Sequence, residues 1–216
     1  MKVILFGATG MVGRGVLREC LLDDRVTAVL AVGRAPTGIE HGKLREITHG
    51  DLLDLTPIEE ELAGYDACFF CLGVSSAGMS EKDYRRITYD YTMSVANTLA
   101  RLSPDSTFVY VSGVGTDAQG RAMWARVKGA TENALLALPL QAYMFRPGYI
   151  QPMHGITSRT RLYRLAYVVV RPLYPVLRRL FPSAVTTTER IGQAMITVAE
   201  RGAPKRILGP SDINAL

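Results

Sequence analysis

The sequence is poor in the residues that build disulfide scaffolds and metal centres. Three cysteines among 216 residues are too few, and odd in number, for a disulfide framework. The three histidines, His41, His49 and His154, show no metal-ligand spacing. No apolar run approaches the roughly 20 residues that span a bilayer. We therefore expect no metal site, no membrane-spanning helix and a reducing cytoplasmic location.

A secretory signal is also missing from the pattern, because an apolar strand pattern begins at Lys2 and leaves no room for a basic region and a cleavage site. The net charge is +5, with 48% hydrophobic and 21% charged residues, which is an ordinary globular balance. Without linkers or repeats, we predict one domain over residues 1–216. Its core covers 1–150, and residues 151–216 form a cap and substrate region.

Cys68 and Cys71 form a C-x-x-C pattern, but they lie within an apolar run. Residues three apart on a strand point to opposite faces of the sheet. A redox dithiol or a metal pair is therefore disfavoured, and we interpret both residues as small core side chains.

Apolar runs alternate with helical patterns up to about residue 150. Strands are predicted at residues 2–6, 26–32, 44–48, 67–72, 107–111 and 142–145, and helices at 11–22, 80–102 and 121–138. Ser80 supplies an N-cap with Asp83 at the third helical position. Such alternation predicts an α/β fold with a doubly wound parallel sheet. After Pro152 we expect a small helical cap over the C-terminal edge of the sheet, a helix from Thr186 to about Arg201, and a short strand at Ile207 and Leu208.

The most informative segment is the glycine turn that follows the first strand. Gly7, Thr9, Gly10, Met11, Val12 and Gly13 join that strand to a helix. In a dinucleotide site the first glycine permits the turn, the second admits the pyrophosphate, and the third lets helix and strand pack closely. The helix N-terminus then directs its positive dipole end toward the phosphates. We predict dinucleotide binding here.

Further cofactor contacts are predicted where later strands end. Arg34 stands where an NAD-preferring site has an acidic residue, and a guanidinium there suits the 2′-phosphate of NADP. NADP(H) is therefore favoured over NAD(H), although Arg34 also fits a solvated loop. Asp51, followed by Leu52, could accept a hydrogen bond from the adenine amino group or merely cap a loop. Leu72 and Gly73 would allow the cofactor to approach closely.

Several motifs now occur in an order that resembles a known family. They are the glycine turn, Val32-Gly33-Arg34, Gly50-Asp51, Cys71-Leu72-Gly73, Tyr110-Val111-Ser112, Lys128-Gly129-x-x-Glu132 and Arg146-Pro147-Gly148. They are similar to those of atypical short-chain dehydrogenase/reductases within the epimerase/dehydratase superfamily. The likeness is greatest to the NADP-binding group that includes the Tat-interacting oxidoreductase. It covers residues 1–150 well and implies a Rossmann fold, with further cofactor contacts at Lys128 and Pro147.

The resemblance also implies an active site made of a Ser, a Tyr and a Lys. Tyr and Lys four apart lie on one helical face, and the lysine charge lowers the pKa of the phenol so that it can exchange a proton with the substrate. Ser112 and Lys128 match the Ser and the Lys, but Trp124 stands at the position of the Tyr. An indole N–H donates only and cannot serve as this acid.

Another group must therefore supply the proton, or the reductase chemistry is lost. Tyr84, Tyr89, Tyr91, Tyr149 and a bound water are the alternatives, and no spacing selects among them. Two functions remain for this sequence. One is an NADP-dependent oxidoreductase or epimerase acting on a small molecule at an altered site. The other is a catalytically silent NADP-binding sensor or interaction module.

Seven arginines lie between Gly155 and Arg190, accompanied by the single acid Glu189. They are Arg159, Arg161, Arg164, Arg171, Arg178, Arg179 and Arg190. This stripe is typical of a solvated helical face, of a lid over an anionic substrate, or of a segment at residues 158–181 that touches acidic lipid. No nucleic-acid module is visible. Long helices such as those at 80–102 and 121–138 often pair across homodimers in related folds, but the sequence leaves the choice between monomer and homodimer open.

Overall fold

The computed structural model describes residues 1–157 and 184–216. A seven-stranded parallel sheet forms its centre, in the strand order β3-β2-β1-β4-β5-β6-β9. These strands are β1 (Lys2–Phe6), β2 (Ala28–Gly33), β3 (Leu44–Thr48), β4 (Ala67–Phe70), β5 (Thr107–Val111), β6 (Gln141–Phe145) and β9 (Ile207–Leu208). The predicted doubly wound Rossmann-type sheet is confirmed, including the short last strand.

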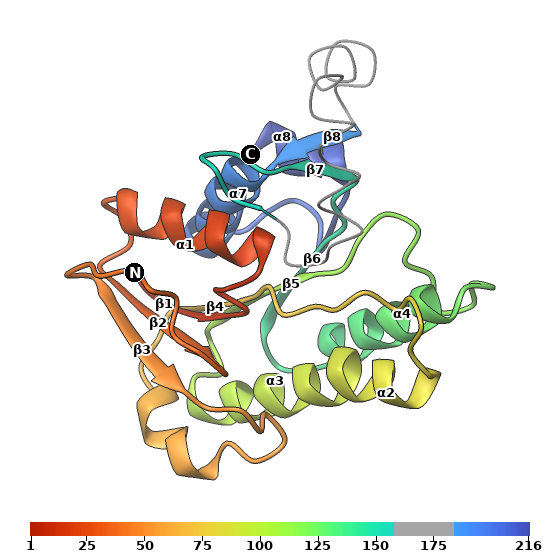
Figure 1. Cartoon of the computed structure of the whole chain (residues 1–216), viewed down its shortest axis with the longest axis horizontal. Coiled ribbons are helices and arrows are strands. Elements are labelled where there is room, and N and C mark those ends of the chain that lie inside the picture. Colours follow the sequence, from red (N-terminus) through yellow and green to blue (C-terminus); the bar gives the residue numbers. More distant parts are fainter. Residues whose placement is uncertain (158–183) are drawn as a thin grey trace.

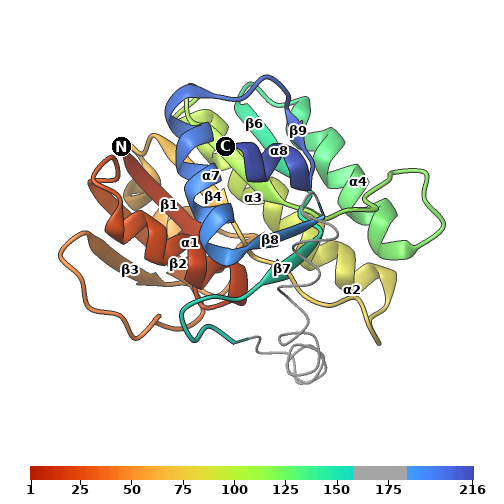
Figure 2. The ribbon, with the colours of Figure 1, turned by 90° about the horizontal axis from the view of Figure 1, so that it is seen from above.

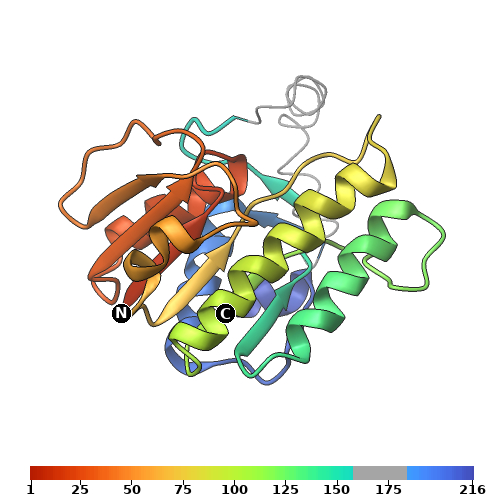
Figure 3. The ribbon, with the colours of Figure 1, turned by 90° about the horizontal axis from the view of Figure 1, so that it is seen from below.

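Helices cover both faces of this sheet (Figures 1, 2 and 3). One face carries α1 (Met11–Leu22), α7 (Thr188–Arg201) and α8 (Pro210–Ala215) (Figure 2). The other carries α3 (Tyr91–Leu102), α4 (Met123–Leu136) and the 3-10 helix η1 (Thr56–Leu62) (Figure 3). Parallel strands buried on both faces require continuous apolar runs, as the sequence of β4 shows.

The alternating pattern of β4 separates its cysteines as predicted. Cys68 packs into the core beneath α3 and α4, whereas Cys71, just beyond the strand, packs against the core beneath α1 and α7. Burial raises the pKa of both thiols. Neither thiol is therefore poised to react as a thiolate.

The long helix predicted from Ser80 to Leu102 is one helical run with an interruption. It consists of α2 (Glu81–Arg85), the π-helical turn η2 (Arg86–Asp90) and α3. The Ser80 hydroxyl accepts the Asp83 N–H at 3.1 Å, which confirms the predicted N-cap. The spacing of apolar residues in the sequence does not reveal a single π turn, because the turn adds only one residue to an otherwise α-helical pattern.

Of the elements predicted after Pro152, the helix that ends at about Arg201 is present as α7, whereas most of the segment predicted as a helical cap lies outside the described residues. The described portion packs mainly on a face of the sheet (Figure 2). After β6 come β7 (Tyr149–Gln151) and, beyond the segment 158–183, β8 (Val185–Thr187), which pair as a small parallel sheet. From β8 the chain enters α7, which lies against α1. Residues 184–216 thus complete the Rossmann layers rather than lying only over the C-terminal edge. Six of the seven arginines in the predicted stripe lie outside the described residues.

Candidate dinucleotide site

The glycine turn joins β1 to α1 at the C-terminal edge of the sheet. Gly7 has a φ of +82°, and a Cβ there would lie 2.6 Å from the Leu72 nitrogen. A Cβ on Gly13 would lie 2.1 Å from the Gly7 carbonyl oxygen. The Gly10 N–H donates to that same oxygen at 2.9 Å. Close backbone approach therefore requires glycine at both ends of the turn, and α1 begins directly behind it.

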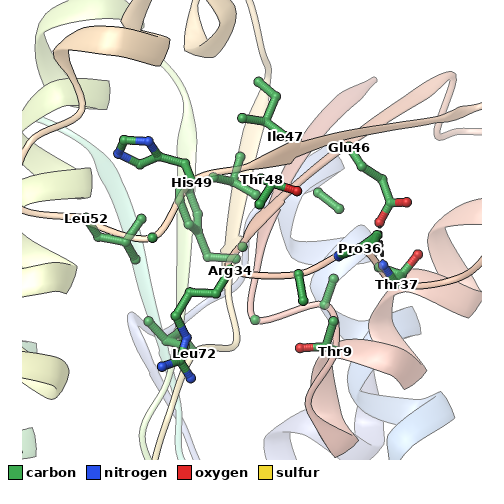
Figure 4. Close-up of a pocket in the computed structure, with 18 of the residues that line it drawn as sticks. Thr9, Arg34, Pro36, Thr37, Glu46, Ile47, Thr48, His49, Leu52 and Leu72 are labelled. Carbon is green, nitrogen blue, oxygen red and sulfur yellow. Dashed lines mark hydrogen bonds between the residues drawn. The ribbon is translucent and has the colours of Figure 1, made fainter.

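A cavity of about 220 Å³ opens beside this turn (Figure 4). Its lining comes from the C-terminal ends of β1, β2 and β3, from the start of the segment after β4, and from Ile87 and Tyr91 on the helical run. Five of the predicted cofactor residues belong to it: Gly7, Thr9, Arg34, Leu52 and Leu72. Ligands of open α/β sheets bind at this edge, so the cavity fits the adenosine half of a dinucleotide.

Six further predicted contacts, at the glycine turn, Asp51 and Gly73, adjoin cavity-lining residues in the sequence without lining the cavity, whereas Lys128 and Pro147 lie in a second cluster. Gly10 is the N-cap of α1, Met11, Val12 and Gly13 form its first turn, and Gly73 follows Leu72. Asp51 uses its carboxylate to accept the Leu53 N–H at 3.1 Å, in a local turn. That bond fits the loop-capping interpretation of Asp51, and its adenine contact stays a prediction.

Arg34 is an exposed cation at the mouth of the cavity. Its side chain extends from the end of β2 toward Leu72 (Figure 4). Within the described part of the chain, none of the ion pairs involves Arg34. An unpaired guanidinium beside a cavity is available to an anionic ligand.

The structure adds three cavity residues that the motifs did not indicate. Glu46 on β3 accepts the Thr37 N–H at 2.7 Å, and so ties the loop after β2 to the neighbouring strand (Figure 4). His49 bonds through Nε2 to the carbonyl oxygens of Asp51 and Asp54, at 2.8 and 2.7 Å. The His49 contacts are local in sequence, whereas the bond between Thr37 and Glu46 joins the loop after β2 to β3, and these two strands lie side by side only in the folded sheet.

A second cluster lies at the ends of β5 and β6. Lys128 on α4 donates from Nζ to the backbone oxygen of Ser112 at 2.5 Å. The Ser112 hydroxyl donates to Glu132 Oε1 at 2.5 Å and lies 3.1 Å from the Phe145 carbonyl oxygen. Ser112 and Lys128 are therefore brought together as expected. The contact between them uses the serine carbonyl, while the serine hydroxyl binds Glu132.

Glu132 and Arg146 form the charged centre of this cluster. Glu132 is only 1% exposed, and its carboxylate accepts Arg146 Nε at 3.0 Å and Nη2 at 2.5 Å. The hydrogen bond to Glu132 raises the pKa of Arg146 above its usual value. Burial lowers the pKa of Lys128 to about 8, although the nearby Glu132 carboxylate opposes that shift. Pro147 follows Arg146, and its carbonyl oxygen accepts the Val114 N–H at 3.1 Å.

Trp124 begins the same helix and packs beneath the loop that follows β5. A Cβ on Gly115 would lie 3.1 Å from the indole ring, and Gly115 has a φ of +86°. The Trp124 side chain is therefore half-buried against this loop.

The alternative tyrosines lie in different places. Tyr91 lines the cavity, Tyr84 is buried, Tyr89 lies under the Arg85 guanidinium, and the Tyr149 hydroxyl donates to Gln151. The structure does not gather them into one site.

The described residues are 1–157 and 184–216. Within these ranges, no helix is both long and apolar enough to cross a bilayer. Over the same ranges, no three His, Cys, Asp or Glu side chains are grouped so that they could hold a metal ion.

The glycine turn and its cavity agree with what the sequence matches. A family model described as NAD(P)H-binding covers residues 7–175. The chain belongs to this NAD(P)H-binding family. The resemblance to atypical short-chain dehydrogenase/reductases is thereby confirmed, and with it the coarser function of an NAD(P)-binding, oxidoreductase-type protein.

Curated relatives point the same way. The protein named FMP52-1, mitochondrial, of Scheffersomyces stipitis is 28% identical over 177 residues, which cover 81% of this chain and 77% of the relative. Protein HTATIP2 of Rattus norvegicus is 26% identical over 153 residues, which cover 69% of this chain and 62% of the relative.

Solved structures share the fold at low identity. A UDP-N-acetylglucosamine 4-epimerase from Methanobrevibacter ruminantium has a TM-score of 0.71 at 14% identity, covering 95% of this chain and 74% of its own. The Bordetella bronchiseptica enzyme WbmF, in complex with NAD+, has a TM-score of 0.70 at 16% identity, covering 99% and 76%. At these identities the likeness establishes the fold alone.

The expected cytoplasmic location is contradicted by the relatives. Five of them, from Scheffersomyces stipitis, Emericella nidulans, Eremothecium gossypii and Meyerozyma guilliermondii, carry names that end in "mitochondrial". The expectation rested on the scarcity of cysteine, which indicates a reducing compartment. A reducing interior is not confined to the cytoplasm, so this signal cannot assign the compartment.

Proposed function

We propose that this protein is an NADP(H)-dependent oxidoreductase that acts on a small molecule at an altered active site. One observation carries the cofactor choice: the Arg34 guanidinium lies beside the cavity at the end of β2 and has no ion-pair partner among the described residues (Figure 4). Cationic, bidentate donors at that place suit a 2′-phosphate, whereas an acidic residue would suit a free ribose hydroxyl.

The chain's own residues divide the binding between them. The backbone at Gly10 and the first turn of α1 would receive the pyrophosphate, because a helix N-terminus offers N–H groups and a positive dipole end. The cavity walls Leu52 and Leu72 would hold the adenine. Lys128 would hold the sugar on the nicotinamide side. When bound, NADPH supplies a hydride to an electrophilic carbon of the substrate.

Arg34 provides the test of this cofactor choice. We expect Arg34→Leu to raise the Kd for NADPH about 10- to 100-fold, because a hydrogen bond to a charged group contributes about 1.5–3 kcal/mol. The Kd for NADH should change less than about twofold. Arg45→Gln is the matched control, because Arg45 lies on β3 and pairs with Glu61 away from the cavity. Nucleotide fluorescence titration measures both constants.

Two results would reject the binding proposal. If neither nucleotide bound below about 1 mM, the site would have another ligand. If NADH bound more tightly than NADPH to the unmodified protein, Arg34 would not have the proposed role.

The second candidate function is a catalytically silent NADP(H)-binding module. A specific observation favours it: the Ser112 hydroxyl is held by Glu132, and Trp124 stands where the proton-donating tyrosine is expected. The two candidates differ in their response to Trp124→Tyr on a panel of small aldehydes and ketones with NADPH. Turnover by the unmodified protein supports the oxidoreductase. Turnover by the variant alone supports the silent module.

A further inference from the structure

Three elements meet around the carboxylate of Glu132. Ser112 ends β5, Arg146 ends β6, and Glu132 lies on α4 between them. The Glu132 carboxylate receives hydrogen bonds from the Ser112 hydroxyl and from two nitrogens of Arg146. Burying a carboxylate that is 1% exposed costs free energy unless such donors compensate for the lost water. Glu132 therefore fixes the relative positions of the two strand ends.

Lys128 joins the same arrangement one helical turn earlier. Residues four apart on a helix share a face, so Lys128 and Glu132 both point toward Ser112. Lys128 Nζ donates to the Ser112 carbonyl oxygen, while the Ser112 side chain is held by Glu132. Ser112 thus links the two charges through its two oxygens, and its orientation decides where the ammonium lies.

We propose that Glu132 is a positioning residue for Lys128. With Arg146 as its counter-ion, it clamps Ser112 so that the serine carbonyl holds the ammonium at the nucleotide site, and its charge keeps that ammonium protonated. The Ser112 hydroxyl acts within this clamp rather than on the substrate. This inference rests on the proposed NADP(H) binding, in which Lys128 is one of the contacts.

The electrostatics of the cluster give this role a measurable consequence. Burial lowers the pKa of Lys128 to about 8, and the Glu132 carboxylate raises it. The other groups facing the cluster are Arg146, which Glu132 binds, Asp117, which faces Arg146, and the buried Tyr110 hydroxyl. Nucleotide binding that uses the ammonium is strong below this pKa and weakens as the pH rises through it.

The experiment measures the Kd for NADPH between pH 7 and pH 10. The 2′-phosphate is fully ionised over this range because its second pKa is about 6, and arginines stay charged. For the unmodified protein we expect a break near pH 8 in the plot of log Kd against pH: the Kd is nearly constant below this pH and rises up to about tenfold per pH unit above it. Glu132→Gln should move this break at least about one unit lower, because the variant lacks the stabilising carboxylate charge.

Two further variants separate this role from mere stabilisation. Glu81→Gln removes a carboxylate that pairs with Arg126 on the same helix α4 and should leave the break unchanged. Glu132→Asp keeps the charge but shortens the reach to Ser112. It should raise the Kd at pH 7 about three- to tenfold while leaving the break in place.

The outcomes distinguish this inference from the function on which it rests. If NADPH does not bind the unmodified protein at any pH, the proposed function fails. If NADPH binds but its Kd shows no break with pH, the positioning role is overturned and the cofactor proposal stands. The same conclusion follows if Glu132→Gln folds and its Kd breaks at the same pH as that of the unmodified protein. If Glu132→Gln does not fold, Glu132→Asp provides the test. A Kd for NADPH at pH 7 equal to that of the unmodified protein would then overturn the positioning role.

Discussion

Gly13 lies where the first turn of α1 crosses the backbone of the glycine turn. We expect Gly13→Ala to lower the free energy of unfolding by about 2–3 kcal/mol, because the new Cβ would meet the Gly7 carbonyl oxygen at 2.1 Å. This loss exceeds the gain of roughly 1 kcal/mol that alanine normally brings to a helix. Urea denaturation measures the change.

Gly42→Ala is the control for that substitution. In the part of the chain that the structure describes, no atom lies within 4 Å of a Cβ at Gly42, so the effect of this substitution should stay within about 0.5 kcal/mol. Equal effects at both positions would show that backbone freedom, rather than close approach, explains Gly13.

Lys128 should leave a signature in the stability of the protein without nucleotide. Its folded pKa of about 8 lies below the usual lysine value of 10.5, so the unfolded chain binds more protons between these two values. Stability due to this group therefore increases as the pH rises from about 8 to 10.5. Lys128→Met lacks this increase. We expect the free energy of unfolding of the variant, relative to the unmodified protein, to decline over that range.

Urea titrations of both proteins at pH 7.5, 8.5 and 9.5 provide this measurement. The difference between the proteins removes the contribution of the buried thiols, which both contain. A difference that stayed constant with pH would show that the ammonium is better solvated than its surroundings indicate.

At the scale of elements, α7 depends on close contact with α1. A Cβ on Gly15 would lie 2.5 Å from the Thr188 side chain, and one on Gly192 would lie 2.7 Å from the Glu19 side chain. The two glycines therefore let the helices cross closely. Apolar periodicity predicted both helices, but the packing of one against the other depends on strand order and became visible only in the fold.

The N-terminus of α7 is secured by a side-chain cap. The Thr187 hydroxyl accepts the Arg190 N–H at 3.0 Å. We expect Thr187→Ala to lower the free energy of unfolding by about 1 kcal/mol, because one helix N–H then lacks its partner. Thr187→Ser retains the hydroxyl oxygen, so it should lower the free energy of unfolding by less than half as much as Thr187→Ala. Thermal unfolding followed by circular dichroism compares the three proteins, and equal losses in both variants would implicate the methyl group instead.

At the scale of the whole molecule, one arginine connects distant parts of the chain. Arg25 bonds Asp23 at 2.7 Å and Glu200 of α7 at 2.8 Å. This contact holds the pKa of Asp23 below its usual value, as Lys205 does for Asp212. Such carboxylates contribute stability above about pH 4, and this contribution is lost as the pH falls through their folded pKa values.

We therefore expect a nearly constant Tm between pH 7 and about pH 5.5, with a decline below about pH 4. Asp23→Asn should lower the Tm at neutral pH and reduce its acid dependence. Asp24→Asn, at an exposed neighbouring position, should do neither. Calorimetry at several pH values measures these differences. If the Tm of Asp23→Asn fell as steeply below pH 4 as that of the unmodified protein, Asp23 would not contribute to the acid dependence of stability.

Local pattern explains which parts of the architecture were predictable. The strands at 44–48 and 107–111 match the structure residue for residue, and the second strand, predicted at 26–32, begins at Ala28. Buried parallel strands are continuous apolar runs bounded by turns, so composition marks them clearly. The strands β7 and β8 were missed because three residues each carry too little pattern.

The sequence by itself determined the sheet, the glycine turn and the opposite orientations of Cys68 and Cys71. These features depend on local sterics and on side-chain periodicity, which neighbouring residues specify. Tertiary structure alone decided that Glu46 holds the loop beside Arg34 and that Glu132 binds the Ser112 hydroxyl. Each of these contacts joins elements that become neighbours only when parallel crossovers bring strand ends to one edge. Hydrogen bonds between such ends leave no periodic mark in the chain.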